Sequence, residues 1–370
     1  MNHVFDVIVI GAGMAGASTA AFLSAHQRVA LLEMEDQAGY HTTGRSAALW
    51  TANYGPDDVR FLSRLSRSFF ETPPERFASV PLLRTRQVLS LATEAQMPAL
   101  NQAMAVGSGL RRVPVTEAIA LLPALRPGYA AGALVEDDAF DMDVAAIHQG
   151  FLRQVSARNG VLALRHRAGQ ITRVSGAWHV QTSAGPVFQA GSIVNAAGAW
   201  GDEIAGRAGI APLGLVPKRR TAAIVNPEPW DAEHWPMARD IAEGWYARPE
   251  ARTRLMVSPA DKTPSYPHDV QPEEIDIATG IDRMQQALDI TVRRVEHTWA
   301  GLRTFTPDGS LAFGMEPGVD GFWWCVGQGG YGIQTAPAAG RLMADLILGH
   351  DPGEAGTVMK AITPSRFRAV

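Results

Sequence analysis

A glycine-rich turn near the start of the chain constrains the fold more than any other feature. Residues 4–10, VFDVIVI, form the apolar, β-branched run that is typical of a strand buried on both faces. The glycines of GAGMAG follow without a gap, and residues 14–25 place apolar side chains on one helical face. Residues 28–33, RVALLE, then predict a second strand. Strand, turn, helix and strand together predict a βαβ unit of about 30 residues.

The glycines and one acidic residue of this unit have separate physical tasks. Gly11 permits a tight turn, Gly13 lets the backbone approach a pyrophosphate, and Gly16 lets the helix pack against the strand. Free N–H groups at the start of the helix, together with the helix dipole, favour phosphate. Glu33 lies 22 residues after Gly11, where a carboxylate accepts hydrogen bonds from ribose hydroxyls. The unit predicts a dinucleotide site, against the alternative of a glycine turn without a ligand, and does not separate FAD from NAD.

A second glycine-rich turn, near the end of the chain, favours a flavin. Residues 322–326 form an apolar strand, GQGGYG follows, and a helix with apolar spacing ends before Gly349 and Pro352. A helix N-terminus stabilises the negative charge that a flavin gains on reduction. Residues 192–200, SIVNAAGAW, predict a further strand of the nucleotide sheet, followed by a turn in which Gly198 allows close backbone approach. An ordinary loop is the alternative for this segment.

Composition narrows the class of protein. A chain of 370 residues exceeds what one hydrophobic core usually supports, so two domains are expected. The net charge of -4 gives no electrostatic reason to expect nucleic acid as a partner. The single cysteine, Cys325, excludes an internal disulfide and a cysteine-based zinc site, and no metal is expected. Because no signal peptide and no apolar run of about 18 residues is found, we expect a cytoplasmic protein without a transmembrane segment.

Several motifs resemble those of a known flavoprotein class. IVIGAGMAG, GYHTTGRSAA, VNAAGAW and GQGGYGIQT resemble the D-amino-acid oxidase, glycine oxidase and sarcosine oxidase class, and PKRRTA, HDVQPEEIDIATG and EHTWAGLR are most similar to its bacterial D-arginine dehydrogenases. The resemblance implies an α/β fold (α+β in its two-domain organisation), with a Rossmann-like FAD-binding domain and an interleaved substrate domain built on an antiparallel β-sheet. The FAD-binding domain is expected at residues 1–52, 143–214 and 305–370, and the substrate domain at residues 53–142 and 215–304. A monomer is expected.

The resemblance also implies residues for the cofactor, which is non-covalent FAD. The expected set is drawn from the motifs above and consists of Gly11, Gly13, Ala15, Gly16, Glu33, Met34, Thr43, Gly44, Arg45, Ser46, Ala47, Ala48, Ala197, Gly198, Gly301, Gly330, Tyr331, Gly332, Ile333 and Gln334.

Four residues match positions that bind the carboxylate of an amino acid, namely Arg303, Arg220, Tyr54 and Tyr246. The planar fork of arginine suits a carboxylate, and tyrosine hydroxyls add neutral donors. Without the resemblance, Arg220 would be interpreted as a solvated surface charge. Arg303 lies among the apolar residues of WAGLRTF, where a lone charge needs a partner, so an ion pair is its alternative role.

Two departures from the resemblance bear on the substrate pocket, to which Gly330 and Gln334 are also expected to contribute. Val88 stands where the arginine enzymes have a glutamate that meets the cationic side chain of the substrate. Because valine cannot pair with a guanidinium, an apolar or neutral substrate side chain is expected. Leu49 replaces a histidine close to the flavin, and its effect on the substrate ammonium or the flavin is left open.

The resemblance implies oxidative deamination of D-amino acids to 2-oxo acids and ammonia, by hydride transfer from Cα to flavin N5. Orientation of the substrate would supply much of the catalysis, and the D-configuration comes from the resemblance alone. The alternative is oxidation of secondary amines or imino acids such as D-proline or N-methyl amino acids. An NAD-dependent dehydrogenase and a non-enzymatic FAD-binding regulator are the other classes. The electron acceptor is left open among a quinone, a dye-like acceptor and oxygen.

Overall fold

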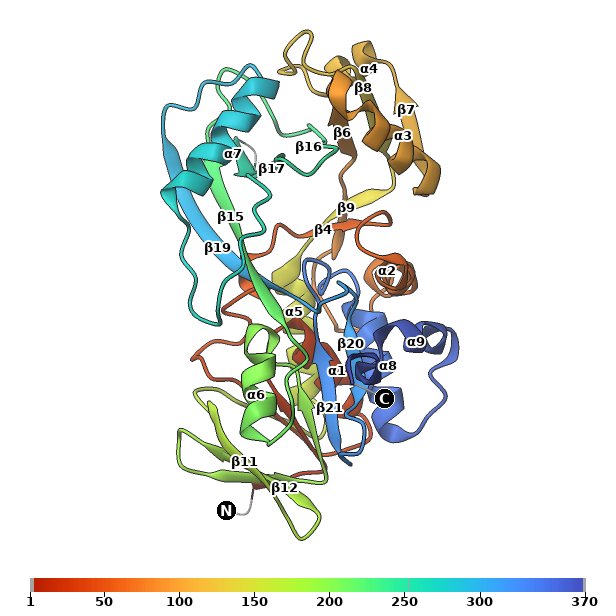
Figure 1. Ribbon diagram of the computed structural model, residues 1–370, viewed down its shortest axis with the longest axis vertical. Helices are drawn as coiled ribbons and strands as arrows, with labels where there is room; N and C mark the ends of the chain where they lie inside the picture. Colours follow the sequence, from red (N-terminus) through yellow and green to blue (C-terminus); the bar gives the residue numbers. More distant parts are fainter. Residues whose placement is uncertain (1–2, 252, 369–370) are drawn as a thin grey trace.

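The structure is a computed structural model and describes residues 3–251 and 253–368. A six-stranded sheet organises the lower part of the molecule (Figure 1). All its neighbouring strands are parallel except the last pair, β21 and β20. In spatial order the strands are β10 (Gly160–Ala163), β3 (Val29–Leu32), β2 (Val7–Ile10), β14 (Ser192–Asn195), β21 (Phe322–Val326) and β20 (Ala312–Met315).

Both faces of this sheet are covered. Side chains alternate across a strand, so Val7 and Val9 pack on one side with the helices, while Ile8 and Ile10 pack on the other side with a second sheet. The helices are α1 (Met14–Leu23), α5 (Val144–Ser156) and α8 (Ala336–Leu348). The second sheet has the order β1 (His3–Val4), β13 (Val187–Ala190), β12 (Ala177–Thr182) and β11 (Ala168–Val174). The predicted βαβ unit is present, with its helix two residues shorter than the expected 14–25.

The expected strand at residues 4–10 is divided between two sheets. His3–Val4 pairs with β13, whereas Val7–Ile10 lies in the six-stranded sheet. Asp6 lies between the two pieces, and its carboxylate accepts hydrogen bonds from the backbone N–H of Arg28 at 2.8 Å and from the Arg28 guanidinium. A charged side chain that must reach a surface partner therefore interrupts the apolar run.

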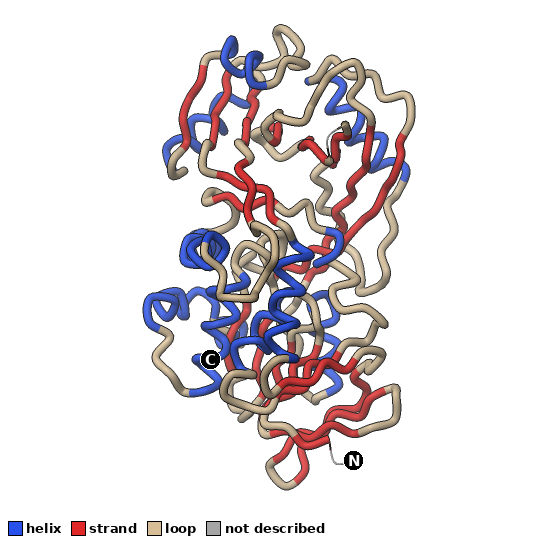
Figure 2. The backbone as a smooth tube through the Cα atoms, turned by 180° about the vertical axis from the view of Figure 1, so that it is seen from behind, coloured by secondary structure: helices blue, strands red, loops and turns tan. Residues whose placement is uncertain are grey.

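An eight-stranded sheet forms the upper part of the molecule, and Figure 2 shows from behind that the strands of the two large sheets occupy separate parts. Its pairs are antiparallel except for β16 with β6. The order is β19 (Val295–Phe305), β15 (Val216–Val225), β18 (Arg254–Ser258), β17 (Tyr246–Glu250), β16 (Met237–Asp240), β6 (Val88–Ala92), β8 (Gly132–Glu136) and β7 (Leu110–Val113). One face packs against α4 (Val115–Leu121) and α7 (Glu274–Ala287). On the other face α3 (Met97–Val106) covers β6 and β8, and residues of β15, β17, β18 and β19 line a cavity shared with the six-stranded sheet.

The remaining elements connect these two parts. A three-stranded sheet has the order β4 (Leu49–Thr51), β9 (Ala139–Met142) and β5 (Leu83–Thr85). The other helices are α2 (Asp57–Glu71), α3 (Met97–Val106), α6 (Gly201–Arg207) and α9 (Met359–Ile362), with short 3-10 turns at Thr43–Arg45, Glu94–Gln96, Gly198–Trp200, Gly353–Val358 and Pro364–Phe367. The strands of the two large sheets come from alternating stretches of the chain, and the domain boundaries given above stay a prediction.

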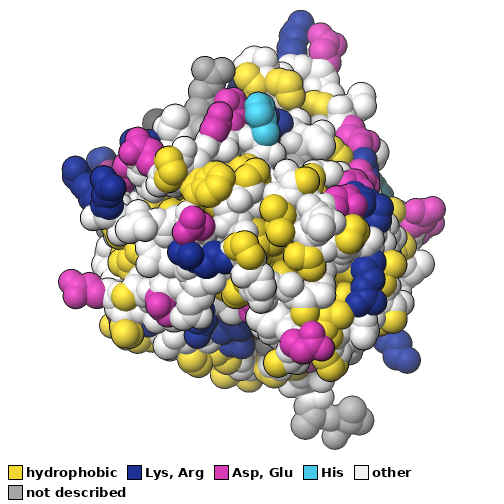
Figure 3. Space-filling model, turned by 90° about the horizontal axis from the view of Figure 1, so that it is seen from above, with side chains coloured by type: hydrophobic (Ala, Val, Ile, Leu, Met, Phe, Trp, Pro, Cys, Tyr) yellow, Lys and Arg dark blue, Asp and Glu magenta, His cyan; other side chains and the backbone are white. Residues whose placement is uncertain are grey.

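The surface of the molecule at one end is mixed in character. Seen from the end formed by the eight-stranded sheet, acidic and basic side chains are interspersed with hydrophobic ones, so neither sign dominates that face (Figure 3). Within the described ranges, no helix combines the length and the apolar character that crossing a membrane requires.

The close packing of the first glycine turn yields a stability prediction. A Cβ atom at Gly16 would lie 1.9 Å from the carbonyl oxygen of Gly11, so Gly16→Ala must shift the turn or the helix. We expect the substitution to lower the free energy of unfolding by about 1–3 kcal/mol, as overpacking does, measured by denaturant unfolding. Gly206→Ala is the matched control, because a Cβ atom there meets open space. Equal stability of both variants would contradict the proposed packing.

Candidate active site

A long cavity runs from the carboxyl ends of the parallel strands to the inner face of the eight-stranded sheet. Ile10, Gly11 and Glu33 line one end, and Arg220 and Arg303 line the other. Carboxyl ends of parallel strands are where open α/β sheets bind their ligands. The cavity therefore connects the predicted nucleotide site with the predicted carboxylate site.

The glycine turn keeps backbone amides free for a ligand. Ala12 N–H donates to Glu33 Oε2 at 3.0 Å, and Met14 N–H donates to Thr43 Oγ1 at 2.9 Å. The amides of Gly13 and Ala15 have no hydrogen-bond partner in the described part of the chain. Unpartnered amides at a helix N-terminus beside a cavity fit a pyrophosphate.

Two backbone amides orient the Glu33 carboxylate, which the sequence predicts to bind a ribose. Its side chain is buried, and the amides of Ala12 and Glu35 each donate to one of its carboxylate oxygens. Burial raises the pKa of the Glu33 carboxyl, although these amides oppose the effect. Each oxygen retains a lone pair that can accept from a ribose hydroxyl. A buried histidine that the sequence analysis missed, His148, contacts the carbonyl oxygen of Ala12 at 2.8 Å and so fixes the turn from behind.

The middle of the cavity is built around Arg45. Its guanidinium donates to the carbonyl oxygens of Ala300 and Val270 at 3.0 and 3.1 Å and pairs with Asp269. Trp299 Nε1 donates to the Arg45 carbonyl oxygen at 3.1 Å. These contacts hold the segment that follows β3 against β19. They also pair the charge of Arg45 within the protein.

Most residues predicted to contact FAD border this space. The cavity wall includes Gly11, Gly13, Ala15, Glu33, Met34, Thr43, Arg45, Ser46, Ala47, Ala197, Gly198, Gly301, Gly330, Gly332 and Ile333. Ala48 and Gln334 border an adjoining pocket, where the Gln334 amide also donates to Ser63 Oγ at 2.7 Å.

Three of the residues predicted to contact FAD line neither the long cavity nor the adjoining pocket. Gly16 packs against Gly11, the amide of Gly44 donates to the Gly39 carbonyl oxygen at 2.8 Å, and the hydroxyl of Tyr331 donates to the Gly309 carbonyl oxygen at 2.8 Å. Their direct contact with a cofactor stays a prediction.

The adjoining pocket brings together the four predicted carboxylate-binding residues and Val88, Leu49, Gly330 and Gln334. It shares a wall with the long cavity at Ser46, Ala47, Arg220, Tyr246, Arg303, Gly330 and Ile333. A ligand in this pocket would lie directly beside a ligand in the cavity.

Arg303 is a cation without an ion-pair partner. Its Nη1 donates to the Tyr54 hydroxyl oxygen at 3.0 Å, and no carboxylate of the described residues lies within ion-pair distance of it. Burial alone would lower its pKa, but the pKa is raised by nearby groups that include Tyr54 and Tyr246. A side chain at Gly330 would come within 3.0 Å of Arg303 Nη1, so the glycine keeps the guanidinium accessible. A half-buried, unpaired guanidinium favours an anionic ligand.

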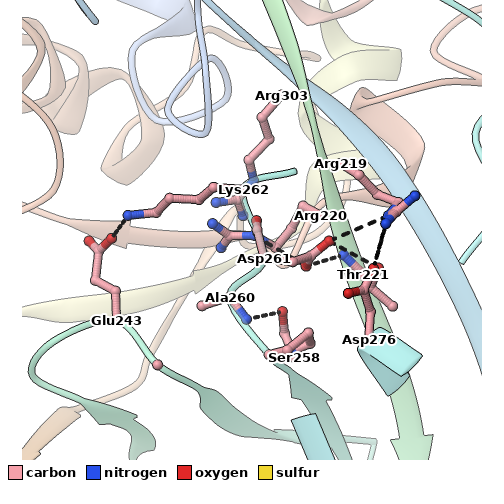
Figure 4. Close-up of polar contacts among 12 residues, drawn as sticks. Arg219, Arg220, Thr221, Glu243, Ser258, Ala260, Asp261, Lys262, Asp276 and Arg303 are labelled. Atoms are coloured by element: carbon pink, nitrogen blue, oxygen red, sulfur yellow. Dashed lines mark hydrogen bonds and ion pairs between the residues drawn. The ribbon is translucent and has the colours of Figure 1, made fainter. Parts of the chain in front are cut away.

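Arg220 is positioned beside the same pocket. Its side chain is 13% exposed, so the interpretation as a solvated surface charge is wrong. Its Nε donates to the carbonyl oxygen of Asp261 at 2.9 Å, and the Asp261 carboxylate accepts from the amide of Thr221 at 2.7 Å. Figure 4 shows that Arg219, the preceding residue, pairs with Asp276 and also lies within ion-pair distance of the Asp261 carboxylate, with 3.8 Å between Nε and Oδ2. Strand alternation therefore separates two adjacent arginines into a structural and a site residue.

Comparison with known proteins identifies the family. A family model described as FAD dependent oxidoreductase matches residues 6–346. The chain belongs to this family. Glycine oxidase of Pseudomonas aeruginosa is 30% identical, over 94% of this chain and 95% of that protein. The predicted flavoprotein class and the cofactor FAD are confirmed, whereas the finer likeness to D-arginine dehydrogenases stays a prediction.

Solved structures confirm the α/β two-domain fold of this FAD-dependent oxidoreductase. Glycine oxidase from Geobacillus kaustophilus superposes with a TM-score of 0.83 at 21% identity and covers 95% of this chain and 96% of its own. L-proline dehydrogenase from P. horikoshii superposes with a TM-score of 0.85 at 19% identity and covers 99% of this chain and 98% of its own. At these identities the likeness concerns the fold alone.

Several pocket residues escaped the sequence analysis. Met237, Arg239, Glu243 and Trp245 line the pocket. Met237 and Arg239 lie on β16, and Glu243 and Trp245 lie in the turn between β16 and β17. β16 pairs with β6, a segment about 150 residues away in the chain. The alternation of side chains along MARD (residues 237–240) could have indicated that Arg239 faces the pocket, but only if the pairing of this strand with β6 had been known.

Tyr246 gives the pocket a predictable pH dependence. Burial alone would raise the pKa of its hydroxyl, but the charges of Arg303 and Arg220 outweigh this effect and lower the pKa. The phenol therefore ionises at a lower pH than free tyrosine, and its negative charge opposes a bound carboxylate. We expect the Kd of butyrate for the FAD-loaded enzyme to rise with alkaline pH, followed by the flavin absorbance.

Tyr246→Phe should remove that rise. Tyr266→Phe is the control, because Tyr266 is 68% exposed and lies outside the pocket. An unchanged pH profile in Tyr246→Phe would contradict the ionisation of Tyr246 as its cause.

Proposed function

We propose that this FAD-dependent oxidoreductase oxidises D-amino acids to 2-oxo acids and ammonia. The observation that carries the proposal is the unpaired Arg303 guanidinium, with the Tyr54 hydroxyl at 3.0 Å, in the wall shared by the pocket and the FAD cavity. The relatives named glycine oxidase support an amino acid as substrate. The D-configuration rests on the sequence resemblance.

The residues of the pocket act by orientation. Arg303 and Tyr54 bind the α-carboxylate, and Arg220 and Tyr246 complete its environment from the neighbouring strands. A fixed carboxylate restricts the position of Cα relative to the shared wall, which is how positioning lowers a barrier. The Arg220 contact with Asp261 holds that guanidinium in one orientation.

The chain offers a complete set of groups for FAD. Glu33 would accept from the ribose, the amides of Gly13 and Ala15 would bind the pyrophosphate, and Gly330 and Ile333 would border the flavin ring. When bound, FAD supplies the acceptor for the hydride that leaves Cα, and water then hydrolyses the imino acid.

We assign no general base within the pocket. Glu243 is paired with Lys262, and the Asp240 carboxylate accepts from the amide of Gly244 at 2.8 Å. The amino group of the substrate must be neutral for hydride to leave Cα, so activity should increase with pH.

Oxidation of secondary amines or imino acids is the second candidate. Dimethylglycine dehydrogenase of Mus musculus is 29% identical, over 49% of this chain and 23% of that protein. Such substrates carry the same carboxylate and would use the same arginine. The electron acceptor, the monomeric state and the cytoplasmic location stay predictions.

Anaerobic reduction of the flavin tests the proposal. We expect D-amino acids to bleach the flavin absorbance of the purified enzyme, and L-amino acids to leave it unchanged. Reduction only by D-proline or N-methyl amino acids would favour the second candidate. A flavin that no amine reduces would indicate a regulator, and subsequent exposure to air distinguishes oxygen from other acceptors.

Substitution of Arg303 tests its role. Arg303→Met should weaken substrate binding about 10- to 150-fold, the value of a charged hydrogen bond of about 1.5–3 kcal/mol, measured as the Kd for anaerobic reduction. Lys218→Met is the matched control, because Lys218 pairs with Arg303 in the sheet register but lies outside both walls. An equal effect of both substitutions would indicate a general loss of positive charge rather than a direct contact.

A further inference from the structure

The wall of the pocket carries a third arginine, Arg239, on a different strand from Arg303 and Arg220. Strand β16 pairs with β6 so that Met237 lies opposite Val88 and Arg239 lies opposite Ser90. Ala238, between them, packs in the core on the other face of the sheet. Alternation therefore places the side chain of Arg239 on the pocket face, in agreement with its position in the pocket wall.

Arg239 has no ion-pair partner. Its Nε donates to Ser90 Oγ at 2.8 Å, which fixes the guanidinium plane. In residues 3–251 and 253–368, no carboxylate lies within ion-pair distance, and the two terminal nitrogens have no hydrogen-bond acceptor. Neither nitrogen is among the fully buried, unpartnered atoms of the described residues, and Arg239 lines the pocket.

The carboxylates near Arg239 are engaged elsewhere. Glu136 accepts from Thr51 Oγ1 at 2.7 Å and from the amide of Ala52 at 3.1 Å. Glu243 is paired with Lys262, as Figure 4 shows. These groups offset part of the positive charge at longer range, but none of them occupies the fork of the guanidinium.

We propose that Arg239 binds a carboxylate at the end of the substrate side chain, so that the enzyme selects dicarboxylic D-amino acids such as D-glutamate. A half-buried guanidinium with two free terminal nitrogens suits a carboxylate and repels a cationic side chain. The α-carboxylate is bound at β19, whereas Arg239 lies on β16, so the second anion must be separated from the first by the side chain.

This inference rests on the proposed function and changes one expectation drawn from the sequence. Val88 indicated an apolar or neutral side chain. Val88 lies beside Met237 in the register, two pairs before Ser90 and Arg239 and therefore on the same face of the sheet. Val88 and Met237 therefore suit the methylene groups of the substrate side chain, and Arg239 suits its carboxylate end.

The experiment compares substrates of the same shape and different charge on the FAD-loaded enzyme. We expect kcat/KM for D-glutamate to exceed that for D-glutamine at least about 10-fold, mainly through KM, as a charged hydrogen bond provides. Arg239→Met should lower the value for D-glutamate by about the same factor and change D-glutamine and D-methionine by no more than about twofold. Arg239→Lys should retain part of the preference. The kcat/KM values for D-aspartate and D-2-aminoadipate show which length of substrate side chain the pocket accepts.

A binding measurement separates failure of the inference from failure of the proposed function. Glutarate should perturb the flavin absorbance at lower concentration than butyrate, and Arg239→Met, but not Lys218→Met, should remove this preference. Reduction by D-methionine or D-glutamine as efficient as by D-glutamate would overturn the inference alone. If no D-amino acid reduces the flavin, the proposed function fails, and equal binding of glutarate and butyrate would then overturn the role of Arg239 as well. An equal loss for all substrates in Arg239→Met, with unchanged flavin content, would assign Arg239 a structural role.

Discussion

The absence of a carboxylate beside Arg303, among the described residues, is the constraint on which the rest of the site depends. A guanidinium in a confined pocket is unfavourable unless an anion compensates it. The fold supplies only a neutral partner, the Tyr54 hydroxyl, and a glycine at position 330 keeps the remaining nitrogens accessible. The missing anion is therefore left to the ligand. Arg45 shows the contrast, because its charge is paired with Asp269 and two carbonyl groups, and it serves to hold β19 against the nucleotide site.

The β19 strand connects the two binding functions. Ala300 accepts from Arg45, Gly301 lines the FAD cavity, and Arg303 lines both the cavity and the pocket. Neighbouring residues of one strand would thus determine how far the proposed carboxylate site lies from the cofactor. A strand of 11 residues that pairs along its length with β15 is a stiff support for this purpose. Precise positioning on regular elements is what orientation catalysis needs.

The sequence predicted those parts of the structure that depend on local chemistry. The first glycine turn, its helix and Glu33 form the expected unit, because glycine conformations and strand–helix spacing are encoded within about 30 residues. The division of the strand at residues 4–10 was not predicted, since it depends on a contact between Asp6 and Arg28. The helix after the second glycine turn begins only at Ala336, and the residues of the glycine turn itself, 329–335, form turns.

Residues that depend on sheet register were harder to predict than residues in motifs. Arg219 and Arg220 are equivalent in sequence, yet one pairs with Asp276 and the other borders the pocket, because adjacent residues of a strand point to opposite faces. Val88 was singled out from the sequence and lines the pocket, but its proposed meaning for specificity depends on β16, a strand that joins it from a distant part of the chain. A valine excludes a cationic partner without indicating what replaces it. The unpaired guanidinium of Arg239, two register positions further along, gives the pocket a positive end, so specificity follows from the pair of strands rather than from either residue alone.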